Sequence, residues 1–174
     1  MIEIPVKDLK VQPFSLISDD WFLITAGTAN KGYNTMTACW GQFGSLWGHG
    51  KGLPTFIVYI RPHRYTKEFI EREDFYTISF FDKSYKKALS YLGTHSGRAE
   101  DKIKETNITP IHQNNITYFA EAKLVLVCRK VYAAPIVENG FFDEQIKMNH
   151  YPEKDYHAMY IGEVVKVLVS TEQF

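Results

Sequence analysis

The chain is organised around residues 33–66, which read YNTMTACWGQFGSLWGHGKGLPTFIVYIRPHRYT. Two β-type runs, at 33–40 and 56–60, flank a glycine-rich segment, 41–52, that we expect to be a loop. Each run has a polar cluster, NTMT in the first and RPHRYT where the second gives way to a helix. Hydroxyl, amide and guanidinium groups beside aromatic residues suit a ligand with phosphate at one end and a planar apolar group at the other.

The rest of the chain favours a mainly β fold in a single domain, residues 1–174. Further strands are expected at 21–26, 75–81, 121–132 and 156–169, with a hairpin over 21–40 and a bulge at Gly162. Apolar spacing predicts short helices at 65–72 and 84–92, and a short polar helix is expected at 99–106. So many short strands with so few helices argue against a doubly wound α/β fold and favour an antiparallel barrel with helices covering its openings.

Composition narrows the classes of partner and site. The formal net charge of zero gives no electrostatic case for a nucleic acid or an anionic membrane. The N-terminus does not resemble a signal peptide and no long apolar run is present, so we expect a cytoplasmic protein. The two cysteines, Cys39 and Cys128, sit in apolar runs and are expected to be buried thiols, and no Cys/His spacing predicts a metal site.

Five segments together resemble the flavin reductase-like family of FMN-binding split barrels, the flavoredoxin-like branch in particular. In chain order they are NTMTACWG at 34–41, RPHRYT at 61–66, FYTISFF at 75–81, SGRAEDK at 96–102 and DYHAMYIGEV at 155–164. The resemblance implies a six-stranded antiparallel Greek-key split barrel with a few short covering helices. It also implies a homodimer with one non-covalent FMN per subunit near the subunit boundary. Ala99 departs from the family pattern, which has an acidic residue there.

The resemblance places the strand segment 34–38 along the flavin, where backbone N–H groups would meet the polar edge of the ring system. The candidate contacts are Asn34, Thr35, Met36, Thr37 and Ala38. The alternative is that Thr35 and Thr37 only satisfy backbone groups at the end of a strand.

A phosphate site is expected where a strand gives way to a helix, because a helix N-terminus offers free N–H groups and a favourable dipole. Its candidates are Arg61, Arg64, Tyr65 and Thr66. The alternative is that the arginines pair with Glu68, Glu71 or Glu73. Further candidate cofactor contacts are Phe81, Ser96, Gly97 and Lys102, and the alternative for Lys102 is an ordinary solvated lysine.

His157, in the closing strand, is the candidate catalytic residue. A hydrogen-bonded structural histidine or a contact with the flavin edge is the favoured alternative, and His150 could approach the same cleft. The aromatic cluster of Trp40, Phe43 and Trp47 could line the flavin or a dimer interface, or belong to the core.

Three functions are compatible with this reading. The first is an FMN-binding oxidoreductase that passes electrons from NADH or NADPH through FMN to free flavin, oxygen or a partner protein. The second is an FMN-binding electron-transfer or flavin-storage protein without a nicotinamide site. The third is a non-redox β-barrel ligand-binding module. The sequence has no GxGxxG motif, so any nicotinamide would bind transiently over the flavin and not in a Rossmann domain.

Overall fold

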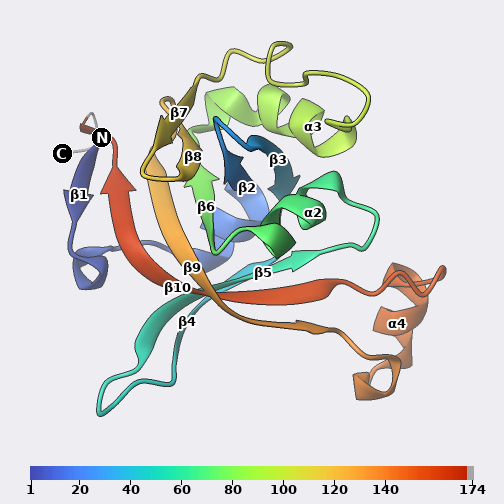
Figure 1. Ribbon diagram of the computed structural model, residues 1–174. Coiled ribbons are helices and arrows are strands. Elements are labelled where there is room, and N and C mark those ends of the chain that lie inside the picture. Colours follow the sequence, from blue (N-terminus) through green and yellow to red (C-terminus); the bar gives the residue numbers. More distant parts are fainter. Residues whose placement is uncertain (172–174) are drawn as a thin grey trace.

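The structure, a computed structural model, describes residues 1–171 and is dominated by one antiparallel sheet (Figure 1). Its strands are β1 (Ile2–Ile4), β2 (Phe22–Thr28), β3 (Gly32–Ala38), β4 (Gly41–Leu46), β5 (Leu53–Ile60), β6 (Phe75–Phe80), β9 (Leu124–Pro135) and β10 (Ala158–Val169). They pair in the order β3-β2-β6-β9-β10-β5-β4, with β1 also on β10. A separate hairpin consists of β7 (Pro110–Gln113) and β8 (Ile116–Phe119), and the α-helices are α1 (Pro13–Ser15), α2 (Tyr65–Arg72), α3 (Lys86–Thr94) and α4 (Glu144–His150).

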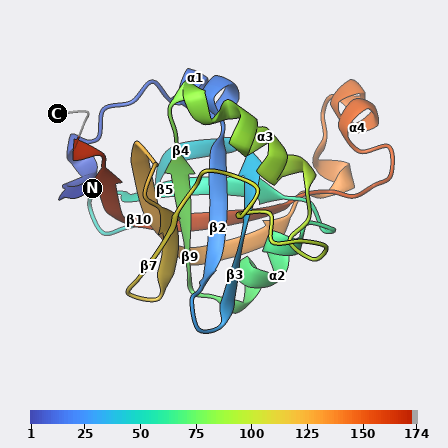
Figure 2. The ribbon, with the colours of Figure 1, turned by 90° about the horizontal axis from the view of Figure 1, so that it is seen from above.

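The connections form a Greek key, and the sheet curls around its core. Strands β6, β9 and β10 pair in succession, and β5, which precedes them in the chain, lies on the far side of β10. Seen from above, β2 and β3 run across β5 and β10 (Figure 2). Phe22 of β2 meets Phe56 of β5 edge to face at 5.5 Å, although these strands are not neighbours in the sheet. The main core therefore lies inside the curl, while a second buried cluster lies between the sheet, α3 and the β7–β8 hairpin.

The predicted count of six strands is wrong, because the large sheet has two further strands, β4 and β1, and the β7–β8 hairpin adds two more. The segment read as a glycine-rich loop begins with β4, which pairs with β5 from Gly41 opposite Val58 to Leu46 opposite Leu53. Glycine weakens the local strand signal, but pairing with β5 supplies the hydrogen bonds that the segment needs. The second addition is β1, on the outer side of β10.

Of the other predictions for single segments and residues, some are confirmed and some are wrong. The hairpin and the helix at 65–72 are confirmed, and the strand register shifts at Gly162, where a Cβ would lie 2.7 Å from that of Cys128. The helix expected at 99–106 is wrong, because the segment forms turns. Cys39 is exposed and so contradicts the expectation of two buried thiols, whereas Cys128 is buried.

The helices that position the site pack on one edge of the sheet. Helix α2 contacts β2 and β3, and α3 contacts β3 (Figure 1). Within residues 1–171, no helix combines the length and the apolar character that a bilayer crossing requires.

Candidate functional site

A small cavity lies where β3, the first turn of α2 and the turn after α3 meet. Its volume is about 110 Å³. The residues that line it are Asn34, Met36, His63, Arg64, Tyr65, Thr66, Thr94, His95, Ser96, Gly97 and Lys102. None of these residues is an aspartate or a glutamate, so the lining has no negatively charged side chain.

Two cations line this cavity, and neither forms a salt bridge within residues 1–171. Arg64 donates from Nη1 to the carbonyl of Gly93 at 2.8 Å. Lys102 is only 5% exposed, and its ammonium donates to the carbonyls of Leu92 at 2.8 Å and His95 at 3.0 Å. Burial, with the charge of Arg64 second, lowers the pKa of Lys102 to about 8. No carboxylate lines the cavity or pairs directly with either cation within residues 1–171, although the negative charge of Glu100 acts on Lys102 from outside the lining.

The polar groups of β3 and α2 are tied together at the cavity wall. Asn34 donates from Nδ2 to the hydroxyl of Thr66 at 2.7 Å. Arg64 is the N-cap of α2, so the N–H groups of Tyr65 and Thr66 lie in its first turn and lack intrahelical acceptors. Gly97 brings its backbone against Asn34, since a Cβ at this position would lie 2.2 Å from Oδ1 of Asn34. Donors from three elements therefore converge on one small volume.

A second cavity, of about 240 Å³, adjoins the first and is more aromatic. It is lined by Met36, Thr37, Ala38, Cys39, Trp40, Tyr59, Arg61, Arg64 and His157. Met36 and Arg64 line both cavities, so the two form neighbouring parts of one elongated cleft. A cationic small end beside an aromatic larger end has the polarity of a phosphorylated, planar ligand.

His157 is held in the wall of the aromatic cavity and is 9% exposed. Its Nδ1 is hydrogen-bonded to the hydroxyl of Tyr151 at 2.9 Å, and its ring lies 4.8 Å from that of Trp40. Trp40 also meets His150 at 5.4 Å, so the two histidines do approach one cleft. Burial, with the charge of Arg61 second, lowers the pKa of His157 to about 4. The imidazole is therefore neutral at neutral pH, which fits a hydrogen-bonded positioning group better than a proton donor.

Arg61 and Arg64 have different partners, although three positions separate them. Arg61 forms a salt bridge with Asp155 and donates to the carbonyl of His150 at 2.9 Å. It thereby joins the end of β5 to the connection between β9 and β10, which includes α4 (Figure 1). Arg64 remains available to the small cavity. None of the glutamates expected as alternative partners pairs with either arginine.

Most predicted site residues line the cleft, and two do not. The small cavity includes Asn34, Met36, Arg64, Tyr65, Thr66, Ser96, Gly97 and Lys102; the aromatic one includes Met36, Thr37, Ala38, Arg61, Arg64 and His157. The Thr35 hydroxyl is instead hydrogen-bonded to the Thr25 hydroxyl at 2.8 Å and donates to the Ile24 carbonyl at 3.2 Å, so its hydrogen-bond partners lie within the sheet. Phe81 is 1% exposed in the second core cluster, and its side chain does not line either cavity.

Several lining residues were missed from the sequence. They are Cys39, Tyr59, His63, Thr94 and His95. Tyr59 could have been predicted from the sequence, because it lies two positions before Arg61, and side chains two positions apart in an extended segment lie on the same side. The others had no local signal, since their role follows from the meeting of β3, β5 and α3.

Comparison with known proteins identifies a family for this chain. The family model described as "Flavin reductase like domain" matches residues 15–174. No curated protein matches the sequence.

Solved structures share the fold at low sequence identity. Flavoredoxin from Methanosarcina acetivorans is 18% identical with a TM-score of 0.65, covering 100% of this chain and 77% of its own. An FMN-binding protein from Thermus thermophilus is also 18% identical with a TM-score of 0.65, covering 98% of this chain and 83% of its own. The NADH:FAD oxidoreductase SgcE6 of Streptomyces globisporus C-1027 is 15% identical with a TM-score of 0.64, covering 87% and 75%.

Proposed function

The chain belongs to the family of flavin reductase like domains, and from that premise we propose that it is a flavoprotein oxidoreductase that binds FMN non-covalently in the cleft described above. Electrons would come from NADH or NADPH and leave to free flavin, oxygen or a partner protein. When bound, FMN supplies the capacity to accept a hydride and to release electrons singly. The chain's own residues supply binding, orientation and exclusion of water.

The observation that carries this proposal is the small cavity, which has two cations without a salt bridge in residues 1–171 and no lining carboxylate. A phosphate monoester brings close to two negative charges and three acceptor oxygens. Arg64, Lys102 and the first-turn N–H groups of α2 are donors of the kind that it needs. The cavity is also too small for much more than a phosphate group, so a larger ligand must continue into the neighbouring space.

The aromatic cavity suits the flavin ring system. Thr37 donates its hydroxyl to the carbonyl of Leu89, which fixes β3 against α3 and holds the backbone of 36–38 at the cavity wall. Trp40 and Tyr59 offer flat apolar surface beside that backbone. We assign His157 a positioning role here, because it is neutral and already bonded to Tyr151.

We further propose a homodimer, as the resemblance implies. Strand β4 ends the sheet and leaves an edge that another chain could pair with or cover. Exposed apolar side chains gather near it: Trp47 is 55% exposed and contacts Tyr132, itself 47% exposed, with ring centroids 6.3 Å apart. Trp40, at the mouth of the aromatic cavity, is 38% exposed. A second copy on this surface would bury these exposed rings, of which Trp40 lines the cleft.

Anaerobic titration tests the function directly. The purified protein is mixed with FMN or riboflavin, and the FMN-loaded protein is then treated with NADH or NADPH while the flavin absorbance is followed. We expect tighter binding of FMN than of riboflavin and bleaching by a nicotinamide. FMN binding without bleaching would favour the electron-transfer or storage function, and no flavin binding would refute a flavoprotein.

A further inference from the structure

The arm, residues 136–157, connects β9 to β10 and stands apart from the barrel (Figure 1, Figure 2). It carries α4, in which every residue is at least partly exposed. The side chains of Phe142, Ile146 and Met148 are exposed, so this part of the arm gains little stability from apolar packing. Its position therefore depends on the contacts that the arm makes with the end of β5.

Arg61, just after β5, makes the main polar contacts between the arm and the barrel. It forms a salt bridge with Asp155 and donates from Nη2 to the carbonyl of His150 at 2.9 Å. Its guanidinium also lies over the ring of Tyr151, at 5.3 Å, and Nδ1 of His63 lies 3.8 Å from the Asp155 carboxylate. The side chains of Arg61 and Asp155 are each 25% exposed, so water can compete for this ion pair. The arm is therefore fastened by contacts that can open.

The residues that hold the arm also form the wall of the aromatic cavity. Arg61, Trp40 and His157 all line it. The arm reaches Trp40 through the ring of His150, at 5.4 Å. It ends at His157, whose ring bonds to the hydroxyl of Tyr151 within the arm. Movement of the arm would therefore shift the wall against which we place the flavin ring system.

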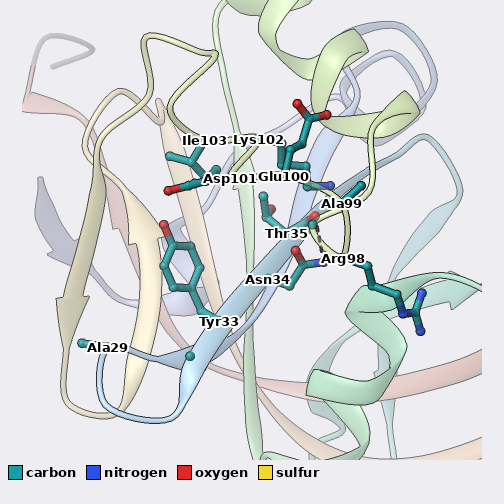
Figure 3. Close-up of a pocket in the computed structure, with 12 residues that line it drawn as sticks. Ala29, Tyr33, Asn34, Thr35, Arg98, Ala99, Glu100, Asp101, Lys102 and Ile103 are labelled. Atoms are coloured by element: carbon teal, nitrogen blue, oxygen red, sulfur yellow. Dashed lines mark hydrogen bonds between the residues drawn. The ribbon is translucent and has the colours of Figure 1, made fainter.

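The wall at the phosphate end of the cleft is fixed more firmly. Lys102 donates to two carbonyls at and just after the end of α3, and Arg98 pairs with Glu68 of α2. A larger cavity, of about 540 Å³, lies beside this wall (Figure 3), but its lining carries Glu100 and Asp101, whose charges oppose the entry of a phosphate from that side. Of the two ends, the aromatic one is therefore the better route for a flavin.

We propose that the arm is a strap that closes the aromatic end of the cleft, and that the ion pair of Arg61 and Asp155 is the latch that holds it shut. The proposal rests on the function proposed above, because it takes the flavin ring system to lie in the aromatic cavity. The base of the arm is held by strand pairing, which continues to Ile136, whose N–H donates to the carbonyl of His157 at 2.9 Å. The strap would open about this base and let a flavin enter or leave. Arg61 and Asp155 are then positioning residues for the cleft and not ligands of the phosphate.

Stopped-flow mixing with FMN, followed by flavin fluorescence, tests the latch through the rates of binding. Asp155→Asn removes the negative charge of the latch, and Asp155 lies outside the lining of both parts of the cleft. Glu138→Gln is the matched control, because it removes a carboxylate whose partner, Lys154 at 3.3 Å, belongs to the same arm. Asp155→Asn should raise the association and dissociation rate constants together, each roughly two- to fivefold, as expected for loss of a partly exposed ion pair. Glu138→Gln should leave both rate constants unchanged.

A rise in the association rate separates a strap from ordinary loosening of the site. Damage to a binding site speeds dissociation without speeding association, whereas a strap that must open limits both. Hydrogen exchange of the flavin-free protein supplies a second readout. The amides of α4 should exchange faster in Asp155→Asn than in wild type or Glu138→Gln, while exchange in the barrel should be the same in all three proteins.

The outcomes separate this inference from the function on which it rests. If FMN associates with Asp155→Asn no faster than with wild type, or if α4 exchanges no faster, the latch is wrong and the FMN site stands. If FMN does not bind to the wild-type protein, both proposals fail.

Discussion

Replacing Arg64 by alanine should weaken FMN binding by about ten- to hundredfold while leaving riboflavin binding almost unchanged. Arg64 lines both parts of the cleft, and within residues 1–171 its side chain makes one hydrogen bond, from Nη1 to the carbonyl of Gly93. A guanidinium has five N–H donors, so several remain for a phosphate. A hydrogen bond to a charged group contributes roughly 1.5–3 kcal/mol, which converts to that range of affinity.

The riboflavin measurement separates loss of the phosphate contact from damage to the cleft. Removing Arg64 also removes its bond to Gly93, at the end of α3, and could loosen that end. Such loosening would weaken riboflavin and FMN together, whereas loss of a phosphate donor affects FMN alone. Isothermal titration of both ligands on wild type, Arg64→Ala and Arg64→Lys provides the comparison.

Arg72→Ala is the matched control for Arg64→Ala. Arg72 is on the same helix, but its guanidinium lies over the ring of Phe69 at 4.2 Å and bonds to the carbonyls of Lys31 and Gly32. Its removal should not change the ratio of the FMN and riboflavin affinities. If Arg64→Ala leaves that ratio as in wild type, Arg64 is not the phosphate anchor and the reasoning from the small cavity is refuted.

Three further predictions concern titration and assembly. FMN affinity should be constant between about pH 6, above which the phosphate carries its second negative charge, and about pH 8. Above about pH 8 the affinity should fall, because Lys102 loses its proton in the FMN-free protein, and calorimetry on Lys102→Met should show no such fall. Because the pKa of His157 is about 4 in the folded protein and about 6.5 in the unfolded chain, the unfolded state is protonated first as the pH falls. The free energy of unfolding of the wild type should therefore drop by up to about 3 kcal/mol between pH 6.5 and 4, and urea unfolding of His157→Asn should lack this drop. In stopped flow, reduction of the flavin by NADH should be at most about tenfold slower in His157→Asn than in the wild type. Light scattering at micromolar concentration should give twice the 20.2 kDa chain mass, and Trp47→Ser should shift it toward the monomer; a monomeric wild type with FMN bound would contradict the proposed dimer.

The sequence predicted those parts of the fold whose signals are local. Helix α2 begins and ends where the pattern placed it, because Tyr65 and Phe69 lie one turn apart and Pro62 interrupts the preceding strand. Strand β4 was missed for the opposite reason. Its sequence, GQFGSL, has little strand propensity, and what makes it a strand is its pairing with β5, which begins seven residues after its last residue.

The chemistry of the site was predictable only as a set of residue types. The motif RPHRYT placed two arginines near a helix N-terminus, but nothing in it separates their roles. The partner that engages Arg61 is Asp155, 94 positions away in the chain, and the carbonyl that receives Arg64 comes from α3. Lys102 was predicted as either a ligand or a solvated lysine, and its burial contradicts the solvated alternative. These distinctions depend on long-range packing, which local patterns do not encode.

The two helix ends at the small cavity explain why its cations can be held there without carboxylates. The first turn of α2 presents free N–H groups, while α3 ends with carbonyls that have no partner in the helix. Lys102 and Arg64 bond to those carbonyls at Leu92, Gly93 and His95, so the negative end of α3 offsets part of their charge. A carboxylate would neutralise them fully and compete with an anionic ligand, whereas carbonyl dipoles orient the cations and leave net positive charge. The end of α3 therefore keeps the cavity positive and ordered before an anion arrives, which lowers the cost of binding one.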